Sequence, residues 1–421
     1  MASRPETGSA EGSRPGGGAK GLAAALGPGL LVAATGVGAG DLATAAFTGG
    51  RLGVSVLWAV VLGAFLKFVI NEGLARWQLA TGETLLEGAL TRFGPAVRWA
   101  FLLYFLLWSF FVGSALISAC GATAHAMLPV FEDAVRGKTV LGAGLSLVGL
   151  ALVLRGGFPL FERVMGACIG VMFVTVLVTA VVVGPEWGAV LRGLLVPTLP
   201  RSTEGLGWTV ALLGGVGGTV TVLCYGYWIR EKGRTSVASL RTCRVDLGVG
   251  YAATALFGLA MVTIGSTVPV EGRGAGLVVQ LADALAVPLG EAGRWAFLAG
   301  AMGAVFSSLL GVWQSAPYIF ADVHRLAFAD AARPVDTRGR PYRSFLVALA
   351  LVPNLGLLFE FRTVQKVYAV FGALFIPMLA LALLAMNGRR EWVGEHRNRP
   401  LTTAVLWSAV ALFLLFGALG L

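Results

Sequence analysis

Apolar runs of about twenty residues recur along almost the whole chain and limit what it can fold into. A helix of that length spans the hydrocarbon layer of a membrane, which is about 30 Å thick. The mean hydropathy of +0.80 and the hydrophobic content of 57% are far above those of a soluble domain. Because no polar block is long enough to fold separately, the sequence predicts one membrane domain.

We expect an all-α, polytopic fold of about eleven transmembrane helices. The apolar runs place them near residues 22–48, 53–80, 97–126, 139–155, 158–184, 207–230, 243–269, 292–322, 343–359, 363–386 and 401–420. Residues 1–20 are rich in Gly, Ser, Pro and Arg and are expected to form a disordered cytoplasmic tail. The transmembrane domain would then cover residues 21–421.

The basic residues indicate the orientation and the partners of the chain. The formal charge is +10, but most of the 32 Lys and Arg residues fall in alternate loops between apolar runs. This positive-inside pattern predicts a multi-pass protein of the inner (plasma) membrane with a cytoplasmic N-terminus. No basic stripe with interleaved aromatic residues is present, so we expect the lipid bilayer, and no nucleic acid, as a partner. The four cysteines are expected to be free thiols, and the oligomeric state stays open.

Two of the predicted helices, the first and the sixth, are interrupted by glycine. The first carries Gly36, Gly38 and Gly40, and the sixth carries Gly214, Gly215, Gly217 and Gly218. Lipid cannot satisfy free backbone groups, so an unwound segment inside a membrane has to line a cavity. Paired interruptions in two halves of a chain mark the substrate site of a transporter. They predict two inverted five-helix repeats, about 22–184 and 207–387, followed by an extra helix at about 401–420; close helix packing through small residues is the alternative.

Several motifs in the same order carry a resemblance to a known family. They are Gly-Pro-Gly-Leu-Leu-Val-Ala at 27–33, Thr-Gly-Glu-Thr-Leu at 81–85, Phe-Glu at 161–162, Gly-Leu-Leu-Val-Pro-Thr-Leu-Pro at 193–200 and Gly-Gly-Thr-Val at 217–220. Together they resemble the Nramp metal-ion transporters over most of residues 22–387. The resemblance implies a LeuT-like fold with broken helices one and six, alternating access and, in typical members, proton-coupled uptake of manganese or iron.

The chain departs from the typical Nramp pattern at the residues that matter most. The family's Asp-Pro-Gly-Asn falls on residues 38–41, so its ligand aspartate is Gly38 and its ligand asparagine is Asp41. Its Met-Pro-His falls on residues 221–223, which removes the thioether and the histidine. Its helix-three acidic pair falls on Ala115 and Ser118. The chain therefore resembles a divergent, Nramp-related branch.

The remaining groups suit a hard ion, because carboxylate, hydroxyl, carbonyl and water ligands favour magnesium or manganese over softer metals. The metal ligands we expect are Asp41 and Thr221, although Asp41 is alternatively a helix cap. The full set of expected substrate-binding residues is Asp41, Gly38, Gly36, Thr221, Gly218, Gln314 and Ser307. The hydroxyls of Ser307 and the neighbouring Ser308 either face the cavity or bond back to their own helix.

Ionisable residues inside the second span are expensive and should be paired in the protein interior. Lys67, Asn71 and Glu72 are candidates for coupling or gating, and Glu72 has Arg76 four residues later, the favourable order for an ion pair. The alternatives are a structural ion pair, a replacement proton relay, and contact of Lys67 with an anion. Tyr225, which follows the sixth-helix glycines, either gates the cavity or belongs to an interfacial aromatic belt.

The sequence therefore favours a secondary transporter of a divalent cation, with magnesium or manganese ahead of iron. The alternative is a transporter of the same fold for another small solute, such as bicarbonate or an amino-acid-like molecule. No nucleophile, base or metal cluster has catalytic spacing, so we expect neither an enzyme nor a cofactor. Because the helix-three acids and the helix-six histidine are missing, we expect uptake to be insensitive to a pH gradient.

Overall fold

The computed structural model describes residues 27–267, 277–328, 334–359 and 361–418; for a few residues inside helices, including 39–41, it describes the backbone alone. These residues form helices and turns, without a strand among them. The all-α prediction is therefore confirmed over the described part of the chain. The expected tail at 1–20 lies outside the described residues.

The described residues of the first half form seven α-helical or π-helical elements and one short 3-10 turn. They are α2 (Pro28–Gly36), η1 (Val37–Leu42), α3 (Ala43–Leu52), η2 (Gly53–Val56), α4 (Leu57–Thr81), α5 (Leu85–Arg92), α6 (Pro95–Met127) and α7 (Ala134–Val182). Helices α2 and α6 begin with proline, which lacks the N–H that a first turn leaves unpaired. The predicted segment 139–155 and nearly all of 158–184 lie in α7 and meet at a kink at Gly157, where φ is 57°.

The second half continues from α8 to α16. Its elements are α8 (Trp187–Leu195), α9 (Thr203–Gly215), η3 (Val220–Leu223), α10 (Cys224–Glu231), η4 (Val237–Ser239), α11 (Leu240–Thr267), α12 (Leu277–Phe328), α13 (Arg340–Leu351), η5 (Val352–Leu358), α14 (Phe361–Asn387), α15 (Arg390–Val393), η6 (Gly394–His396) and α16 (Pro400–Ala418). Every helix predicted in this half overlaps one or more of these elements. The predicted extra helix corresponds to α16.

By length and composition, seven helices in the described residues can cross a membrane, or eight if the bent pair Arg390–His396 and Pro400–Leu415 forms one span. This count treats the 49-residue α7 as one helix, although it contains two predicted segments. The number of eleven spans therefore stays a prediction. Large apolar side chains on the outer faces, such as Leu103 (62% exposed) and Val174 (65% exposed), are what a lipid-facing surface requires.

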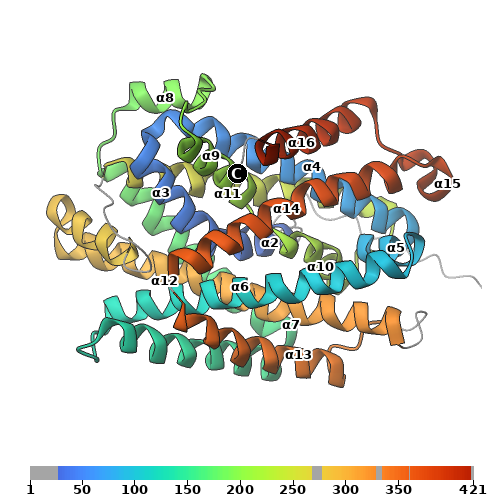
Figure 1. Ribbon diagram of the computed structural model, residues 1–421, viewed down its shortest axis with the longest axis horizontal. Helices are drawn as coiled ribbons and strands as arrows, with labels where there is room; N and C mark the ends of the chain where they lie inside the picture. Colours follow the sequence, from blue (N-terminus) through green and yellow to red (C-terminus); the bar gives the residue numbers. More distant parts are fainter. Residues whose placement is uncertain (1–26, 268–276, 329–333, 360, 419–421) are drawn as a thin grey trace, which may run out of the picture.

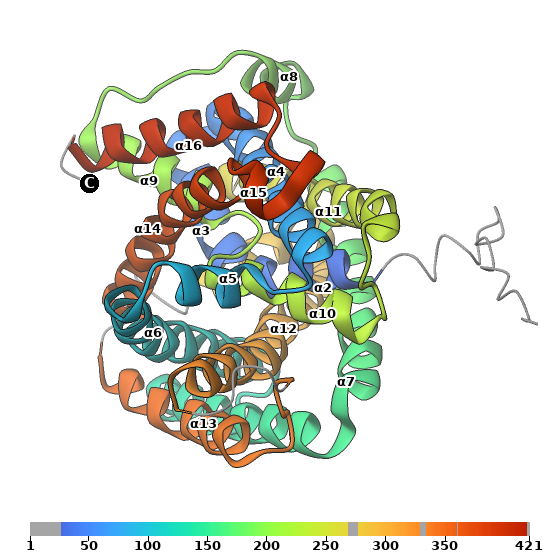
Figure 2. The same ribbon diagram turned by 90° about the vertical axis from the view of Figure 1, so that its right-hand side faces the viewer.

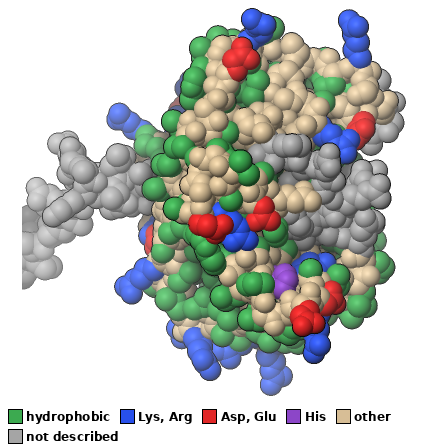
Figure 3. Space-filling view, turned by 90° about the vertical axis from the view of Figure 1, so that its left-hand side faces the viewer, with side chains coloured by type: hydrophobic (Ala, Val, Ile, Leu, Met, Phe, Trp, Pro, Cys, Tyr) green, Lys and Arg blue, Asp and Glu red, His purple; other side chains and the backbone are tan. Residues whose placement is uncertain are grey.

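Helix α2 lies in the interior of the bundle. All of its residues except Leu30 are buried, as expected for a helix that is apolar on every side. Helices α10, α11 and α12 pack around it, and α6 and α7 lie further out (Figures 1 and 2). Viewed from one end, the surface carries charged side chains scattered among hydrophobic ones, several of them at its edges (Figure 3).

Candidate functional site

Helix one, formed by α2, η1 and α3, is interrupted at Gly38. Gly38 has the non-helical angles φ −66° and ψ −108° within the π turn. Its backbone N–H donates to Ser308 Oγ at 2.6 Å, and Ser308 Oγ donates to the Ala34 carbonyl at 3.0 Å. A hydroxyl from α12 thus bridges two groups of helix one that a regular helix would join directly. A Cβ at Gly38 would collide with Ser308, so the bridge requires glycine there.

Helix six, formed by α9, η3 and α10, is interrupted between residues 215 and 220. Gly217 and Gly218 have φ values of 79° and 89°, in the region that glycine adopts without strain. Thr219 has the irregular angles φ −122° and ψ −105°, which are neither helical nor extended, and the chain then enters a 3-10 turn. The predicted unwinding of helices one and six is confirmed.

The two breaks meet at one small pocket. A Cβ at Gly36 would collide with the backbone of Gly217 and Gly218, so the two chains are in direct contact. The cavity beside them has a volume of ≈ 10 Å³, about enough for one water molecule. Its lining residues are Thr35, Gly36, Trp108, Val112, Leu116, Gly218, Thr219, Thr221, Ser308, Val312 and Tyr368. Both breaks therefore line the same cavity.

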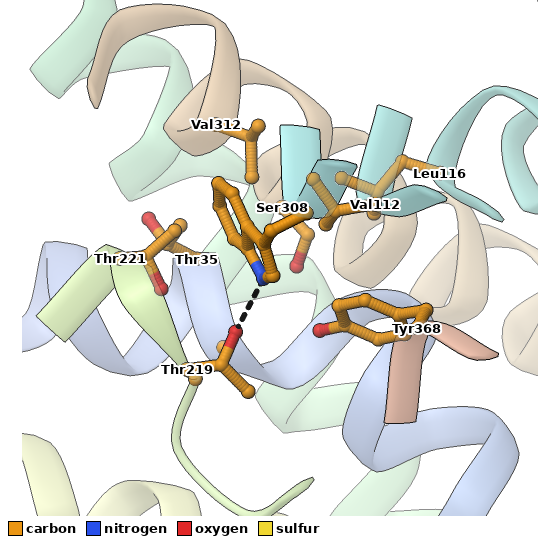
Figure 4. Close-up of a pocket in the computed structure, with 11 residues that line it drawn as sticks. Thr35, Val112, Leu116, Thr219, Thr221, Ser308, Val312 and Tyr368 are labelled. Carbon is orange, nitrogen blue, oxygen red and sulfur yellow. Dashed lines mark hydrogen bonds between the residues drawn. The ribbon is translucent and has the colours of Figure 1, made fainter. Parts of the chain in front are cut away.

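Hydroxyl groups and aromatic rings give the pocket its polar character. Trp108 Nε1 donates to Thr219 Oγ1 at 3.0 Å, which fixes the side chain of the break against α6. The hydroxyl of Tyr368 points toward Thr219 from α14 (Figure 4). The described lining residues include oxygen donors from three threonines, one serine and one tyrosine, but no carboxylate.

The predicted substrate residues are partly brought together. Gly36, Gly218 and Thr221 line the pocket, and Gly38 adjoins it through Ser308. Ser307, which precedes the lining residue Ser308 in the sequence, is fully buried. Its hydroxyl lies 3.0 Å from the carbonyl of Ala304 on its own helix. Of the two serines, Ser308 is therefore the one that reaches the cavity.

Gln314 and Tyr225 lie away from the pocket lining. Gln314 Oε1 accepts from Trp228 Nε1 at 2.6 Å, which ties α12 to α10. The Tyr225 hydroxyl donates to Asp246 at 3.1 Å, and its side chain is fully buried, so it does not belong to an exposed aromatic belt. Their roles in binding and gating stay predictions.

The ionisable residues of α4 have separate partners. Glu72 accepts from Arg76 at 3.2 Å, so the predicted i,i+4 ion pair is confirmed, and it also pairs with Arg244 at 2.7 Å. Lys67 instead reaches the helix-six break, where its ammonium donates to the carbonyls of Gly214 and Gly218. Asn71 Nδ2 donates to the hydroxyl of Tyr251 at 2.5 Å.

Asp41 lies within η1, next to the break in helix one. Its side chain is outside the described part of the structure, so its roles in substrate and metal binding stay predictions. Among the described residues, no group of three or more His, Cys, Asp or Glu side chains is placed to hold a metal. The four cysteines are free, as predicted.

Asp246 anchors the start of helix one. Its carboxylate is fully buried in α11 and accepts from the backbone N–H groups of Gly27 and Gly29, at 3.1 and 3.0 Å. It also pairs with Arg234 at 2.9 Å and accepts from Tyr225. A negative charge at this helix N-terminus satisfies unpaired N–H groups and complements the helix dipole.

Ion pairs close the end of the molecule that carries α5 and α10. Glu87 of α5 pairs with Arg230 at 2.8 Å and with Arg325 of α12 at 2.6 Å. Arg325 also binds Asp322, which accepts from Tyr227 at 2.7 Å. Burial raises the pKa of Glu87, but the hydrogen bond and charge of Arg230 and the charge of Arg325 outweigh it and hold the net pKa below its ordinary value.

Comparison with known proteins identifies the family. A family model described as natural resistance-associated macrophage protein-like, or Nramp, matches residues 29–421. The chain belongs to the Nramp family.

Two relatives of this Nramp chain are named as divalent metal cation transporters. MntH 1 of Pseudomonas aeruginosa is 28% identical over 416 residues, which cover 93% of this chain and 89% of that protein. MntH of Aeromonas hydrophila is 28% identical over 407 residues, with 92% of each protein covered.

Solved structures agree with the family assignment at the level of the fold. A mutant of the Eremococcus coleocola manganese transporter superposes with a TM-score of 0.76 at 19% identity, covering 97% of this chain and 89% of that one. MhsT in complex with L-phenylalanine superposes with a TM-score of 0.61 at 15% identity, covering 93% and 98%. The LeuT-like fold implied by the sequence motifs is therefore confirmed.

Three features of this Nramp site were missed from the sequence. Trp108 and Tyr368 lie in α6 and α14, where an aromatic residue in an apolar span carries no sign that it faces a cavity. Asp246 did carry a signal, because it is the sole carboxylate of α11 and an acid inside an apolar span is expensive unless it is paired.

Proposed function

We propose that this protein is a secondary transporter that moves a divalent metal cation across a cell membrane by alternating access. The observation that carries the proposal is the pair of facing helix breaks around one small polar pocket. Membership of the Nramp family and the names of the MntH relatives support a metal as the substrate. The pocket has room for about one water, so loading a hydrated ion needs a rearrangement of the surrounding helices.

We propose magnesium or manganese ahead of iron. Thr221 lines the pocket at the position where typical members have a methionine, so a hydroxyl stands in place of a thioether. Oxygen ligands favour hard ions, and magnesium keeps much of its water when it binds. Asp41 would supply the carboxylate, and the backbone carbonyls of both breaks would supply further oxygens. No step in this account requires an enzymatic group or a cofactor.

A second candidate is a transporter of another small solute, such as bicarbonate or an amino-acid-like molecule. It is favoured by the absence of a carboxylate among the described lining residues. In either case we place the protein in the inner (plasma) membrane as a multi-pass protein with a cytoplasmic N-terminus, as the basic loops predict.

Uptake into proteoliposomes tests the proposal, with manganese and magnesium detected by dyes enclosed in the vesicles and bicarbonate by an enclosed pH dye. The wild-type protein should take up manganese or magnesium. Gly36→Ala should abolish uptake, because its Cβ would collide with the backbone of the other break, whereas Gly215→Ala meets open space and should keep it. Bicarbonate uptake without metal uptake would favour the second candidate and overturn the first.

A further inference from the structure

A lysine ammonium is held inside the helix-six break by backbone carbonyls. Lys67 of α4 is 1% exposed, and its Nζ donates to the Gly214 carbonyl at 2.7 Å and to the Gly218 carbonyl. Gly214 belongs to the last turn of α9, and Gly218 belongs to the unwound stretch that follows. The Lys67 ammonium therefore connects the end of α9 to the unwound stretch of helix six.

The carbonyls at this position attract positive charge for a general reason. The last carbonyls of a helix have no partner within it and form the negative end of the helix dipole. At the end of α9, the Leu212 carbonyl accepts from Val216 N and the Gly215 carbonyl accepts from Gly218 N. The Gly214 carbonyl between them accepts from Lys67.

The described carboxylates of α4, α9 and α11 have cationic partners of their own. Glu72 of α4 pairs with Arg76 and Arg244, Glu204 of α9 pairs with Arg51, and Asp246 of α11 pairs with Arg234. These are the acidic residues that the described parts of α4, α9 and α11 contain. Two backbone carbonyls, those of Gly214 and Gly218, are thus partners of the ammonium, as in a cation site made of carbonyls.

Asn71 brings a further oxygen to the same face of α4, one turn after Lys67. It is fully buried, its Nδ2 donates to Tyr251, and its Oδ1 has no hydrogen-bond partner among the described residues. The ring of Tyr251 in turn lies against Gly217, because a Cβ there would be 2.8 Å from it. The surroundings of the break are therefore rich in oxygen groups that suit a cation.

In transporters with broken helices, unwound carbonyls and the C-terminal ends of half-helices hold the coupling cation. We propose that the helix-six break of this protein is a monovalent-cation site whose occupant is the ammonium of Lys67. The protein carries this cation as part of its own chain, so the break keeps its geometry without sodium or potassium. The expectation that transport needs no sodium or potassium rests on the proposed transport function, whereas the cation site itself does not.

Chemical rescue tests the site. Lys67→Ala removes three carbons and the ammonium nitrogen, and propylammonium has the same three carbons and nitrogen. In purified full-length protein, Lys67→Ala should lower Tm by several degrees, and propylammonium should restore most of the loss with a saturable dose dependence. Propanol, which has the same shape without the charge, should restore little, and the wild-type Tm should respond to neither compound.

Leu66→Ala is the matched control, because it truncates the neighbouring buried residue of α4 without removing a charge. Its Tm loss should not be recovered by propylammonium. If Lys67→Ala does not fold, Lys67→Met keeps most of the stem, and ammonium or potassium replaces propylammonium in the same titration. The proposal is overturned if the Lys67 variant is as stable as wild type, or if these cations rescue it no better than they rescue Leu66→Ala.

A separate measurement tests whether a sodium gradient drives transport. An inward sodium gradient should leave manganese uptake by wild-type proteoliposomes unchanged, and propylammonium should restore uptake by Lys67→Ala. Stimulation of wild-type uptake by sodium would contradict the inference. If the wild-type protein carries neither manganese nor magnesium, the proposed function fails, while the thermal titration still decides whether the cation site exists.

Discussion

At the scale of single residues, Ser308 determines how helix one is broken. Its hydroxyl accepts from Gly38 N at 2.6 Å and donates to the Ala34 carbonyl at 3.0 Å. The adjacent Ser307 has a partner within its own helix, the Ala304 carbonyl at 3.0 Å, and a longer contact of 3.4 Å to Ala34. Two neighbouring serines of the same burial therefore have different roles.

Ser308→Ala should destabilise the protein more than Ser307→Ala does. Removal of the bridging hydroxyl leaves a buried N–H and a buried carbonyl without this partner, at a cost of about 1–3 kcal/mol. Thermal unfolding of the two variants side by side measures the difference. Equal Tm values would show that the bridge does not support the break.

At the scale of the elements, the carboxylate of Asp246 holds three segments together. It connects the N-terminus of α2, the start of α10 through Tyr225, and the loop after α10 through Arg234. Movement of the N-terminus of α2 away from α11 has to break the hydrogen bonds from Gly27 and Gly29 to Asp246. Asp246 therefore holds helix one in place.

Asp246→Asn should cost about 3–5 kcal/mol of unfolding free energy, because it leaves a buried guanidinium without its charged partner. Asp283→Asn is the control; its carboxylate pairs with Arg294 but is 56% exposed, and a surface pair contributes about 0–1 kcal/mol. Denaturant or thermal unfolding measures the stability of both variants. A loss for Asp246→Asn as small as that for Asp283→Asn would contradict this role of Asp246.

The Glu87 cluster predicts a pH dependence of stability. The pKa of Glu87 is lowered in the folded protein, so its contribution is present above the unfolded pKa and is lost as the pH falls through the folded value. Glu87→Gln should therefore have a lower Tm than wild type at pH 7, and the gap should narrow below about pH 4. Glu83→Gln should give a smaller gap, because the Glu83 side chain is 43% exposed and that of Glu87 is 12% exposed. A Glu87→Gln gap that is constant with pH would contradict this assignment.

The elements themselves were largely predictable from the sequence, and their contacts were not. Apolar runs locate the helices because burial in lipid requires them, and the paired glycines locate the breaks because other residues resist positive φ. Which of Ser307 and Ser308 reaches the cavity depends on the rotation of α12 about its axis. Two adjacent serines in the sequence do not reveal that rotation. The partners of Lys67 lie about 150 residues away on another helix, beyond the reach of local pattern.

At the scale of the whole molecule, the breaks are closed around a pocket of ≈ 10 Å³, and ion pairs close the end formed by α5, α10 and α12. Alternating access requires that such contacts break and re-form on opposite sides of the site. Because the chain lacks the helix-three acids and helix-six histidine of typical members, no proton relay is expected along this route.

Uptake of manganese or magnesium should therefore respond little to a pH gradient across the proteoliposome membrane. The internal pH, followed with an enclosed dye during metal entry, should stay constant apart from the leak seen in empty vesicles. Acidification in step with metal entry would reveal a proton pathway through other residues.

The measurement that tests the central claim most directly is metal uptake by Asp41→Ala beside wild type and Asp283→Ala. If Asp41 is the carboxylate that meets a divalent cation at the break of helix one, its loss should weaken apparent affinity about ten- to a hundred-fold, the value of a charge-assisted contact. Asp283→Ala, on an exposed surface, should behave as wild type. Unchanged manganese and magnesium uptake by Asp41→Ala would contradict the account.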